Sequence, residues 1–196
     1  MGKIFCLMGK SSSGKDTIYK ALLNSKTLDL KKIVSYTTRP IREGEQNGVE
    51  YYFLEEADVE KLNEENKIIE MRTYNTCHGP WRYLTVKDHQ IDLDANDYLI
   101  IGTPDSYLSI KEYFGEDVVV PMMILLDDGV RLQRALDRER NQEEPKYEEM
   151  CRRFLADAKD FSPEKMEGCN ISHEFVNNDL VHCIKEIEEF IQSYSK

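Results

Sequence analysis

The feature of this chain that most constrains its fold is a glycine-containing loop directly after a short apolar run. Residues 4–8 read IFCLM and residues 9–17 read GKSSSGKDT. Gly9, Gly14 and Lys15 have the spacing of the phosphate-binding pattern G-x-x-x-x-G-K-[ST]. Residues 3–8 are expected to form a buried strand, and residues 16–24 (DTIYKALLN) have the pattern of a helix. A strand, this loop and a helix in that order predict a site where backbone N–H groups surround phosphate.

Several residues of the loop are therefore candidates for binding ATP, with Lys15 reaching its β- and γ-phosphates. These candidates are Gly9, Ser11, Ser12, Ser13, Gly14, Lys15, Asp16 and Thr17. Asp16 stands where the pattern has Ser or Thr, whose hydroxyl ligates Mg²⁺. A carboxylate is also a hard oxygen ligand, so we predict that Asp16 holds Mg²⁺ directly or through water. The alternative is a serine-rich turn that merely joins a strand to a helix.

Further strands and helices alternate along the chain. The apolar runs DYLIIG (97–102) and VVVPMMILL (118–126) are typical of strands buried on both faces, and a helical pattern follows each. The chain ends with a strand over 173–178 and a helix whose apolar residues share one face. This order predicts an α/β fold with a parallel sheet. We expect a core over 1–33, 87–128 and 161–196, a β-rich insertion over 34–86, and a charged helical segment over 129–160 interrupted near 141–145.

Within the insertion, four strands and one helix are expected. The strands are predicted at 33–38, 49–54, 67–75 and 80–86, and the helix at 55–66.

Composition narrows the class of protein. The 196 residues suit one compact domain, and the net charge of −11 argues against nucleic acid as a partner, because binding a polyanion needs a basic face. The five cysteines are scattered, odd in number and without a C-x-x-C pair, which predicts free thiols in the cytoplasm. No segment approaches the about 18 apolar residues of a membrane span, so no membrane partner is expected.

A second anion-binding segment lies at residues 35–53, SYTTRPIREGEQNGVEYYF. Arg39 and Arg42 are three residues apart beside a turn, and Tyr51 follows at the start of a predicted strand. Two guanidinium groups and a phenol suit the phosphate of an acceptor molecule, since Arg binds phosphate oxygens in pairs. Taken alone, the segment could equally be a solvated charged loop.

This segment resembles the nucleoside-monophosphate-binding signature of the guanylate kinases, S-x-T-T-R-x-x-R-x-G-E-x-x-G-x-x-Y-x-F. The phosphate loop, IIE at 68–70, RRF at 152–154 and VNNDL at 176–180 follow in family order, so the resemblance covers nearly the whole chain. It implies a P-loop NTPase fold in which the insertion binds the acceptor and residues 129–160 form a lid. It also implies transfer of the ATP γ-phosphoryl group to GMP with Mg²⁺.

The resemblance implies roles for individual residues as well. Arg39, Arg42 and Tyr51 would hold the acceptor phosphate, and Ser35 would contact the base edge. Glu70 would accept hydrogen bonds from the N1–H and 2-amino groups of guanine. Arg138 and Arg153 would close over the transferring group, with Arg134 as an alternative. Asn177 would lie near the adenine of ATP. The implied catalytic set is Lys15, Arg39, Arg138 and Arg153.

Two departures from the family pattern affect the acceptor-base pocket. Gly102 and Pro104 stand where the family has an acidic pair, so Asp105 could substitute one residue later. Asp127 and Asp128 also end a predicted strand, although a helix N-cap explains them equally well. A short Y-G-[ST] element of the family corresponds either to Tyr83 and Thr85, which we favour for acceptor binding, or to His78 and Gly79.

Two alternatives to GMP phosphorylation stay open from the sequence. One is a kinase for another nucleoside or deoxynucleoside monophosphate. The other is a non-catalytic, guanylate-kinase-like protein-binding module. Such modules typically lose the phosphate loop, whereas Gly9, Gly14 and Lys15 are present here.

Overall fold

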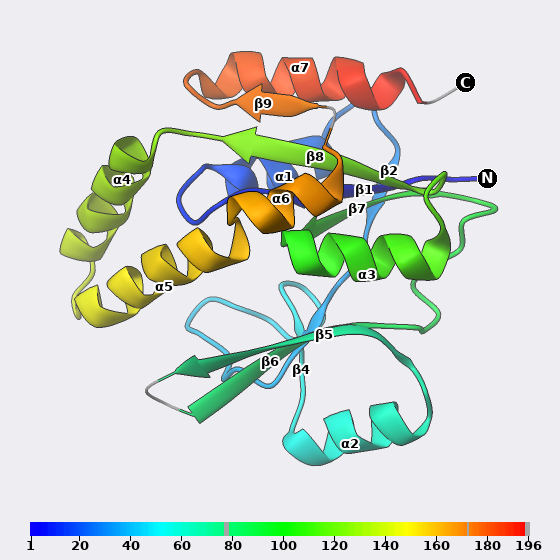
Figure 1. Ribbon diagram of the computed structural model, residues 1–196, viewed down its shortest axis with the longest axis horizontal. Helices are drawn as coiled ribbons and strands as arrows, with labels where there is room; N and C mark the ends of the chain where they lie inside the picture. The colour runs from blue at the N-terminus through cyan, green and yellow to red at the C-terminus, as the bar shows by residue number, and fades with distance from the viewer. Residues whose placement is uncertain (77–78, 172, 195–196) are drawn as a thin grey trace.

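The computed structural model describes residues 1–76, 79–171 and 173–194, and it contains two β-sheets with helices packed around them (Figure 1). The strands are β1 (Ile4–Met8), β2 (Leu30–Lys32), β3 (Tyr36–Thr37), β4 (Tyr52–Phe53), β5 (Ile68–Thr76), β6 (Gly79–Val86), β7 (Asp97–Gly102), β8 (Val119–Leu125) and β9 (Glu174–Val176). The helices are α1 (Lys15–Leu23), α2 (Glu56–Glu64), α3 (Pro104–Phe114), α4 (Asp128–Arg140), α5 (Tyr147–Asp160), α6 (Pro163–Cys169) and α7 (Leu180–Gln192).

The larger sheet has the strand order β2-β7-β1-β8-β9, and every neighbouring pair is parallel. All five residues of the central strand β1 are buried. Phe5 and Leu7 pack with residues of α1 and α7, whereas Ile4, Cys6 and Met8 pack with residues of α3 and α6. Because both faces of the strand are covered by helices, its sequence is apolar throughout instead of alternating.

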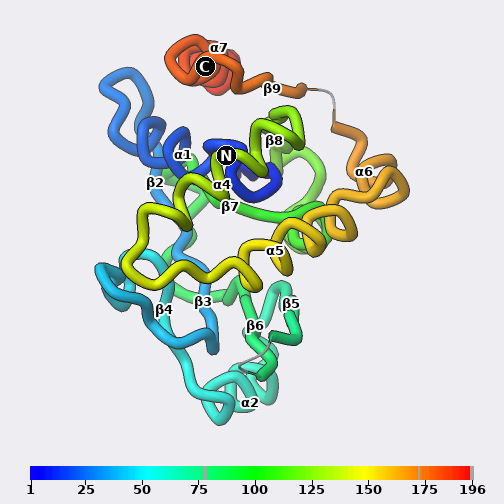
Figure 2. The backbone as a smooth tube through the Cα atoms, turned by 90° about the vertical axis from the view of Figure 1, so that its left-hand side faces the viewer, coloured from blue at the N-terminus to red at the C-terminus, as the bar shows by residue number. Residues whose placement is uncertain are grey.

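The smaller sheet has the order β4-β3-β6-β5 and is built around the antiparallel hairpin of β5 and β6. Helix α2 covers it, and Val59 of this helix packs against Leu84 and Val86 of β6. In both views this sheet lies on one side of the larger sheet, and α5 extends from the end of α4 over the region between them (Figures 1 and 2).

Most expected elements are present. The parallel sheet is confirmed, as is the break between α4 and α5 near residues 141–145. The prediction of a single strand over 33–38 is wrong, because β2 ends at Lys32 in the larger sheet and β3 begins at Tyr36 in the smaller one. The chain crosses from one sheet to the other at Ile33–Ser35, which local strand propensity cannot detect. Within the described residues, no helix is both long and apolar enough to cross a membrane.

Candidate active site

A cleft lies where the larger sheet, the smaller sheet and α5 meet. It opens at the carboxyl ends of β1 and β7, which is where open parallel sheets place their ligands. Its lining is Gly9, Ser11, Lys15, Ser35, Tyr51, Arg72, Tyr74, Trp81, Tyr83, Ile101, Gly102, Thr103, Arg152, Arg153, Ala156, Asp157, Asp160 and Phe161. The phosphate loop and the insertion over residues 34–86 therefore contribute to one cavity.

The phosphate loop connects β1 to α1 with the geometry that its glycines require. Gly14 has a φ of 92°, and a Cβ placed there would lie 2.2 Å from Nδ2 of Asn177. A side chain at this position would be both strained and obstructed. Lys15 begins α1, lines the cleft and lies 3.7 Å from the exposed carboxylate of Asp16. The helix N-terminus and the Lys15 ammonium together favour a negatively charged ligand.

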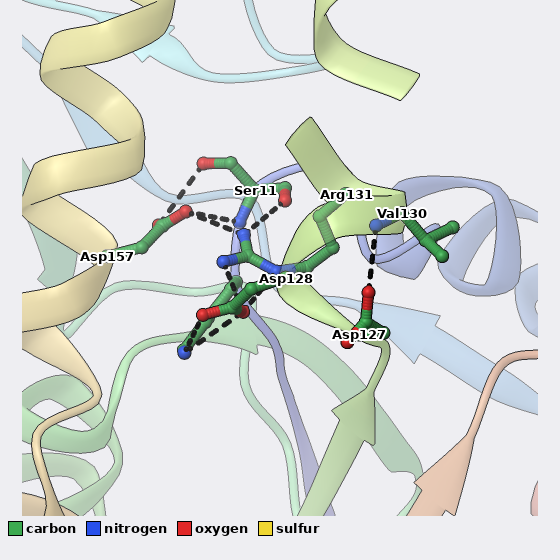
Figure 3. A network of polar contacts seen from close by, with 7 residues as sticks. Ser11, Asp127, Asp128, Val130, Arg131 and Asp157 are labelled. Atoms are coloured by element: carbon green, nitrogen blue, oxygen red, sulfur yellow. Dashed lines mark hydrogen bonds and ion pairs between the residues drawn. The ribbon is translucent and has the colours of Figure 1, made fainter. Parts of the chain in front are cut away.

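Ser11 connects the loop to α4 and α5 through all of its polar groups (Figure 3). Its backbone N–H donates to Asp157 Oδ2 at 2.8 Å, its hydroxyl donates to Oδ1 at 3.2 Å, and its carbonyl accepts from Arg131 at 2.8 Å. Arg131 also donates to Asp157 and Asp128, and it is 2% exposed. This buried network fixes the loop against the two helices.

Asn177 lies beneath the same loop. It is buried, and its Nδ2 donates to the carbonyl of Ser13 at 2.7 Å. Within the described residues, its Oδ1 and the hydroxyls of Ser12 and Ser13 are buried without a hydrogen-bond partner. In this structure Asn177 supports the loop and does not line the cleft. Its place near adenine stays a prediction.

The two arginines predicted to bind the acceptor phosphate, Arg39 and Arg42, differ in their surroundings. Arg39 is 3% exposed, and its two terminal nitrogens donate to Glu45 at 2.9 and 2.8 Å. Its guanidinium also lies 5.3 Å from the ring centre of Tyr51, which lines the cleft. Glu45 further accepts from the backbone N–H of Arg42 at 2.8 Å. The predicted phosphate-binding turn is therefore held together by one carboxylate.

Arg42 is near two other cations. Partial enclosure, followed by the charges of Arg39 and Arg153, lowers the pKa of its guanidinium. Arg153 belongs to α5 and lines the cleft. Neither Arg39 nor Arg42 lines the cleft, but with Arg153 they concentrate positive charge beside it, as an anion site requires.

The β5–β6 hairpin forms another wall, which sequence reasoning described only in part. Glu70 and Thr85 are a cross-strand pair and are both buried, and the Thr85 hydroxyl donates to Glu70 at 2.9 Å. Neither lines the cleft, whereas Ser35, Tyr51 and Tyr83 do.

Sequence reasoning missed several residues of the cleft lining: Arg72, Tyr74, Trp81, Arg152, Asp157 and Asp160. The alternation of a strand would have found Arg72 and Tyr74, because they share a face with Glu70. Asp160, which accepts from the Tyr74 hydroxyl at 2.9 Å, could not be found without knowing that α5 reaches the hairpin.

The remaining lid candidates lie on α4. Arg138 is exposed and lines a second, smaller cavity together with Ser11, Ser12 and Arg153. The alternative residue Arg134 also lies beside the phosphate loop: one of its terminal nitrogens is 3.9 Å from the position of a Cβ on Gly14. The structure therefore places Arg153 in the main cleft and both α4 arginines beside it.

The departures at the strand ends have structural explanations. A Cβ at Gly102 would lie 2.7 Å from Cys6 Sγ and 2.8 Å from Ser106 Oγ, so no acidic side chain fits there without displacement. Asp105 pairs with Lys165 of α6 and does not line the cleft. Asp127 caps α4 by accepting from the N–H of Val130 at 3.1 Å (Figure 3). His78, part of the alternative alignment, and Cys77 lie outside the described residues.

Comparison with known proteins agrees with this architecture. The family model described as guanylate kinase matches residues 1–82. A guanylate kinase of Caldanaerobacter subterraneus subsp. tengcongensis is 28% identical over 97% of this chain and 86% of its own length. One of Porphyromonas gingivalis is 25% identical over 99% and 98%, respectively. The crystal structure of guanylate kinase from Anaplasma phagocytophilum matches 98% of this chain and 85% of its own, with a TM-score of 0.64 and 23% identity.

These matches extend over nearly the whole chain, and they agree with the P-loop NTPase fold, the phosphate loop and the two-sheet architecture described above. The chain is therefore similar to guanylate kinases in sequence and in fold over nearly its whole length.

Proposed function

We propose that this chain is an ATP-dependent guanylate kinase that converts GMP and ATP to GDP and ADP. The observation that carries the proposal is the single cleft lined by Lys15 of the phosphate loop, Tyr51 of the acceptor segment and Arg153 of α5. A donor triphosphate on the loop and an acceptor monophosphate on the insertion would meet there. Guanylate kinase is also the name of the relatives that match almost the full chain.

Catalysis by this site consists of positioning and charge neutralisation. The acceptor phosphate is already anionic at neutral pH, so no general base is needed. Lys15 would neutralise the transferring phosphoryl group, while Arg39, Arg42 and Tyr51 hold the acceptor phosphate. Arg153 and one α4 arginine, Arg138 or Arg134, would close over the reacting groups and exclude water.

The exposed Asp16 carboxylate fits a Mg²⁺ ion brought with ATP, since proteins hold Mg²⁺ by one or two carboxylates plus substrate phosphates. Bound there, Mg²⁺ would neutralise charge on the β- and γ-phosphates. We also place the reaction in the cytoplasm, because the described cysteines Cys6, Cys151, Cys169 and Cys183 are free thiols.

The experiment is ADP formation with Mg·ATP across a panel of GMP, AMP, CMP, UMP and their deoxy forms. We expect GMP to support the fastest turnover. Lys15→Met should lower kcat by roughly 100-fold or more, as for other preorganised electrostatic contacts. Lys20→Met, an exposed position on the same helix, is the matched control and should be unchanged. If a folded Lys15→Met variant turns over normally, the site is misassigned.

A further inference from the structure

The hairpin wall of the cleft consists of three cross-strand pairs in register. Glu70 lies opposite Thr85, Arg72 opposite Tyr83, and Tyr74 opposite Trp81. The members of each strand are two residues apart and therefore share one face. The last two pairs line the cleft, whereas the first does not. Arg72 is thus the charged residue that this wall presents to a ligand.

Glu70 is already surrounded by donors. Its side chain is 2% exposed, and its Oε1 accepts from the Thr85 hydroxyl at 2.9 Å. Arg72 donates from Nε to Oε2 at 3.1 Å and from Nη2 to Oε1 at 3.4 Å. A buried carboxylate with both oxygens engaged has little capacity left for the N1–H and 2-amino groups of a base.

Arg72 is fixed between the two sheets. Besides Glu70, its Nη1 contacts Thr103 Oγ1 at 3.3 Å, at the residue that caps α3. Burial lowers the pKa of Arg72, but the charge and hydrogen bond of Glu70, together with Tyr74 and Tyr51, outweigh this effect and raise it, so the guanidinium stays cationic. Each terminal nitrogen carries two N–H groups, and the contacts of Nη1 and Nη2 are long. Both nitrogens can therefore direct a donor into the cleft.

Aromatic residues neighbour Arg72 in the wall, since Tyr83 lies opposite it and Tyr74 follows two residues later on the same strand. The rings of Tyr74 and Tyr83 are 5.8 Å apart in an edge-to-face arrangement, and Trp81 lines the same cavity. Aromatic faces beside a hydrogen-bonding group suit a planar nucleobase.

We propose that Arg72 is the specificity-determining residue of the acceptor-base pocket and donates to the O6 and N7 acceptors of guanine. Arginine forms this bidentate pair with guanine by its geometry. Glu70 is then a positioning residue that orients Arg72. The inference rests on the proposed function, because it concerns the base of the same acceptor. Adenine is excluded, since its 6-amino group would meet a donor.

The proposal differs measurably from direct reading by Glu70. IMP keeps O6 and N7 but lacks the 2-amino group, so it should bind almost as well as GMP. The 7-deaza analogue of GMP lacks N7 and should bind roughly 10-fold more weakly. If Glu70 reads the base instead, IMP is the nucleotide that loses affinity.

The test is calorimetric titration of GMP, IMP and 7-deaza-GMP into the protein. ADP formation from ATP is measured in parallel. In the Arg72→Met variant, GMP should bind roughly 10-fold more weakly, and the penalty for 7-deaza-GMP should disappear. Arg82→Met is the matched control, because Arg82 lies on the same hairpin, pairs with Glu56 and does not line the cleft. It should keep the wild-type ranking.

Each outcome separates this inference from the proposed function. The role of Arg72 is overturned if the wild-type protein binds GMP at least 10-fold more tightly than IMP and shows equal affinity for 7-deaza-GMP and GMP. This result needs only the wild-type protein, so it holds even if Arg72→Met does not fold. An unchanged 7-deaza-GMP penalty in folded Arg72→Met overturns this role too. The expected binding pattern without ADP formation supports the role of Arg72 and contradicts the kinase proposal.

Discussion

At the scale of single residues, charged groups in and around the cleft are held by opposite charges. Glu45 binds the guanidinium of Arg39 and the backbone of Arg42, Glu70 binds Arg72, and Asp157 binds Arg131. Arg39, Arg72 and Arg131 are largely buried, so each acidic partner fixes its position. Preorganised cations of this kind stabilise a polyanionic transition state without rearranging.

Asp16 differs because its side chain is 74% exposed beside Lys15. If it holds Mg²⁺, Asp16→Asn should lower kcat and raise the Mg²⁺ concentration needed for half-maximal activity. ATP without metal should bind the variant no worse, since a negative charge near the phosphates has been removed. ATP affinity measured with and without Mg²⁺ in both proteins tests this expectation. An unchanged metal requirement and turnover would show that phosphate and water alone hold the ion.

Glu45 gives stability a defined pH dependence. Burial raises the pKa of its carboxyl, but hydrogen bonds from the Arg39 side chain and the Arg42 backbone outweigh burial and lower it below 4.5. Because the folded-state pKa is depressed, the stabilisation is complete above about 4.5 and is lost as the pH falls through the folded-state pKa.

Glu45→Gln should therefore destabilise the protein at pH 7, by about 1.5–3 kcal/mol. The difference in unfolding free energy between wild type and variant should narrow as the pH is lowered below 4.5. Urea denaturation across this pH range measures it. Glu60→Gln, an exposed position on α2, serves as the control. A difference that is independent of pH would mean that the Glu45 charge does not stabilise the turn.

At the scale of elements, α5 connects the phosphate loop to the β5–β6 hairpin of the smaller sheet. Asp157 near its carboxyl end holds Ser11, while Arg153 one turn earlier lines the cleft. The contact therefore positions this part of α5, including Arg153, against the loop.

Asp157→Ala should loosen this connection. We expect faster hydrogen exchange in residues 10–14 and a kcat lowered by roughly 10-fold, because small displacements of catalytic groups are costly. Asp137→Ala, on the exposed face of α4, is the matched control. Wild-type exchange rates and turnover in a folded Asp157→Ala variant would contradict the coupling.

The sequence predicted elements well where the pattern was long and local. The phosphate loop, the strands buried on both faces and the hairpin were predictable because apolar periodicity and glycine spacing determine them locally. The cleft wall was less predictable. Asp157 and Asp160 look like ordinary helix charges until α5 is packed against the loop and the hairpin. The enclosure of Glu70 by Arg72 and Thr85 likewise depends on the β5–β6 register.

At the scale of the whole molecule, the two sheets bring Lys15 of the phosphate loop and Tyr51 of the insertion to one cleft. The parallel order of the larger sheet was predictable from alternating strands and helices. The crossing of the chain from one sheet to the other at 33–35 was not predictable, because a strand pattern continues through these residues. The prediction at this scale is that neither nucleotide reacts alone: the phosphoryl group passes directly between them, and water is excluded when both are bound.

The most direct measurement of this claim is transfer of the labelled γ-phosphoryl group of ATP in the presence of Mg²⁺ and GMP. The account predicts that the label appears in GDP, with one ADP formed for each GDP, and that little inorganic phosphate is released. Label recovered only as inorganic phosphate, or remaining in ATP in the presence of GMP, would contradict it.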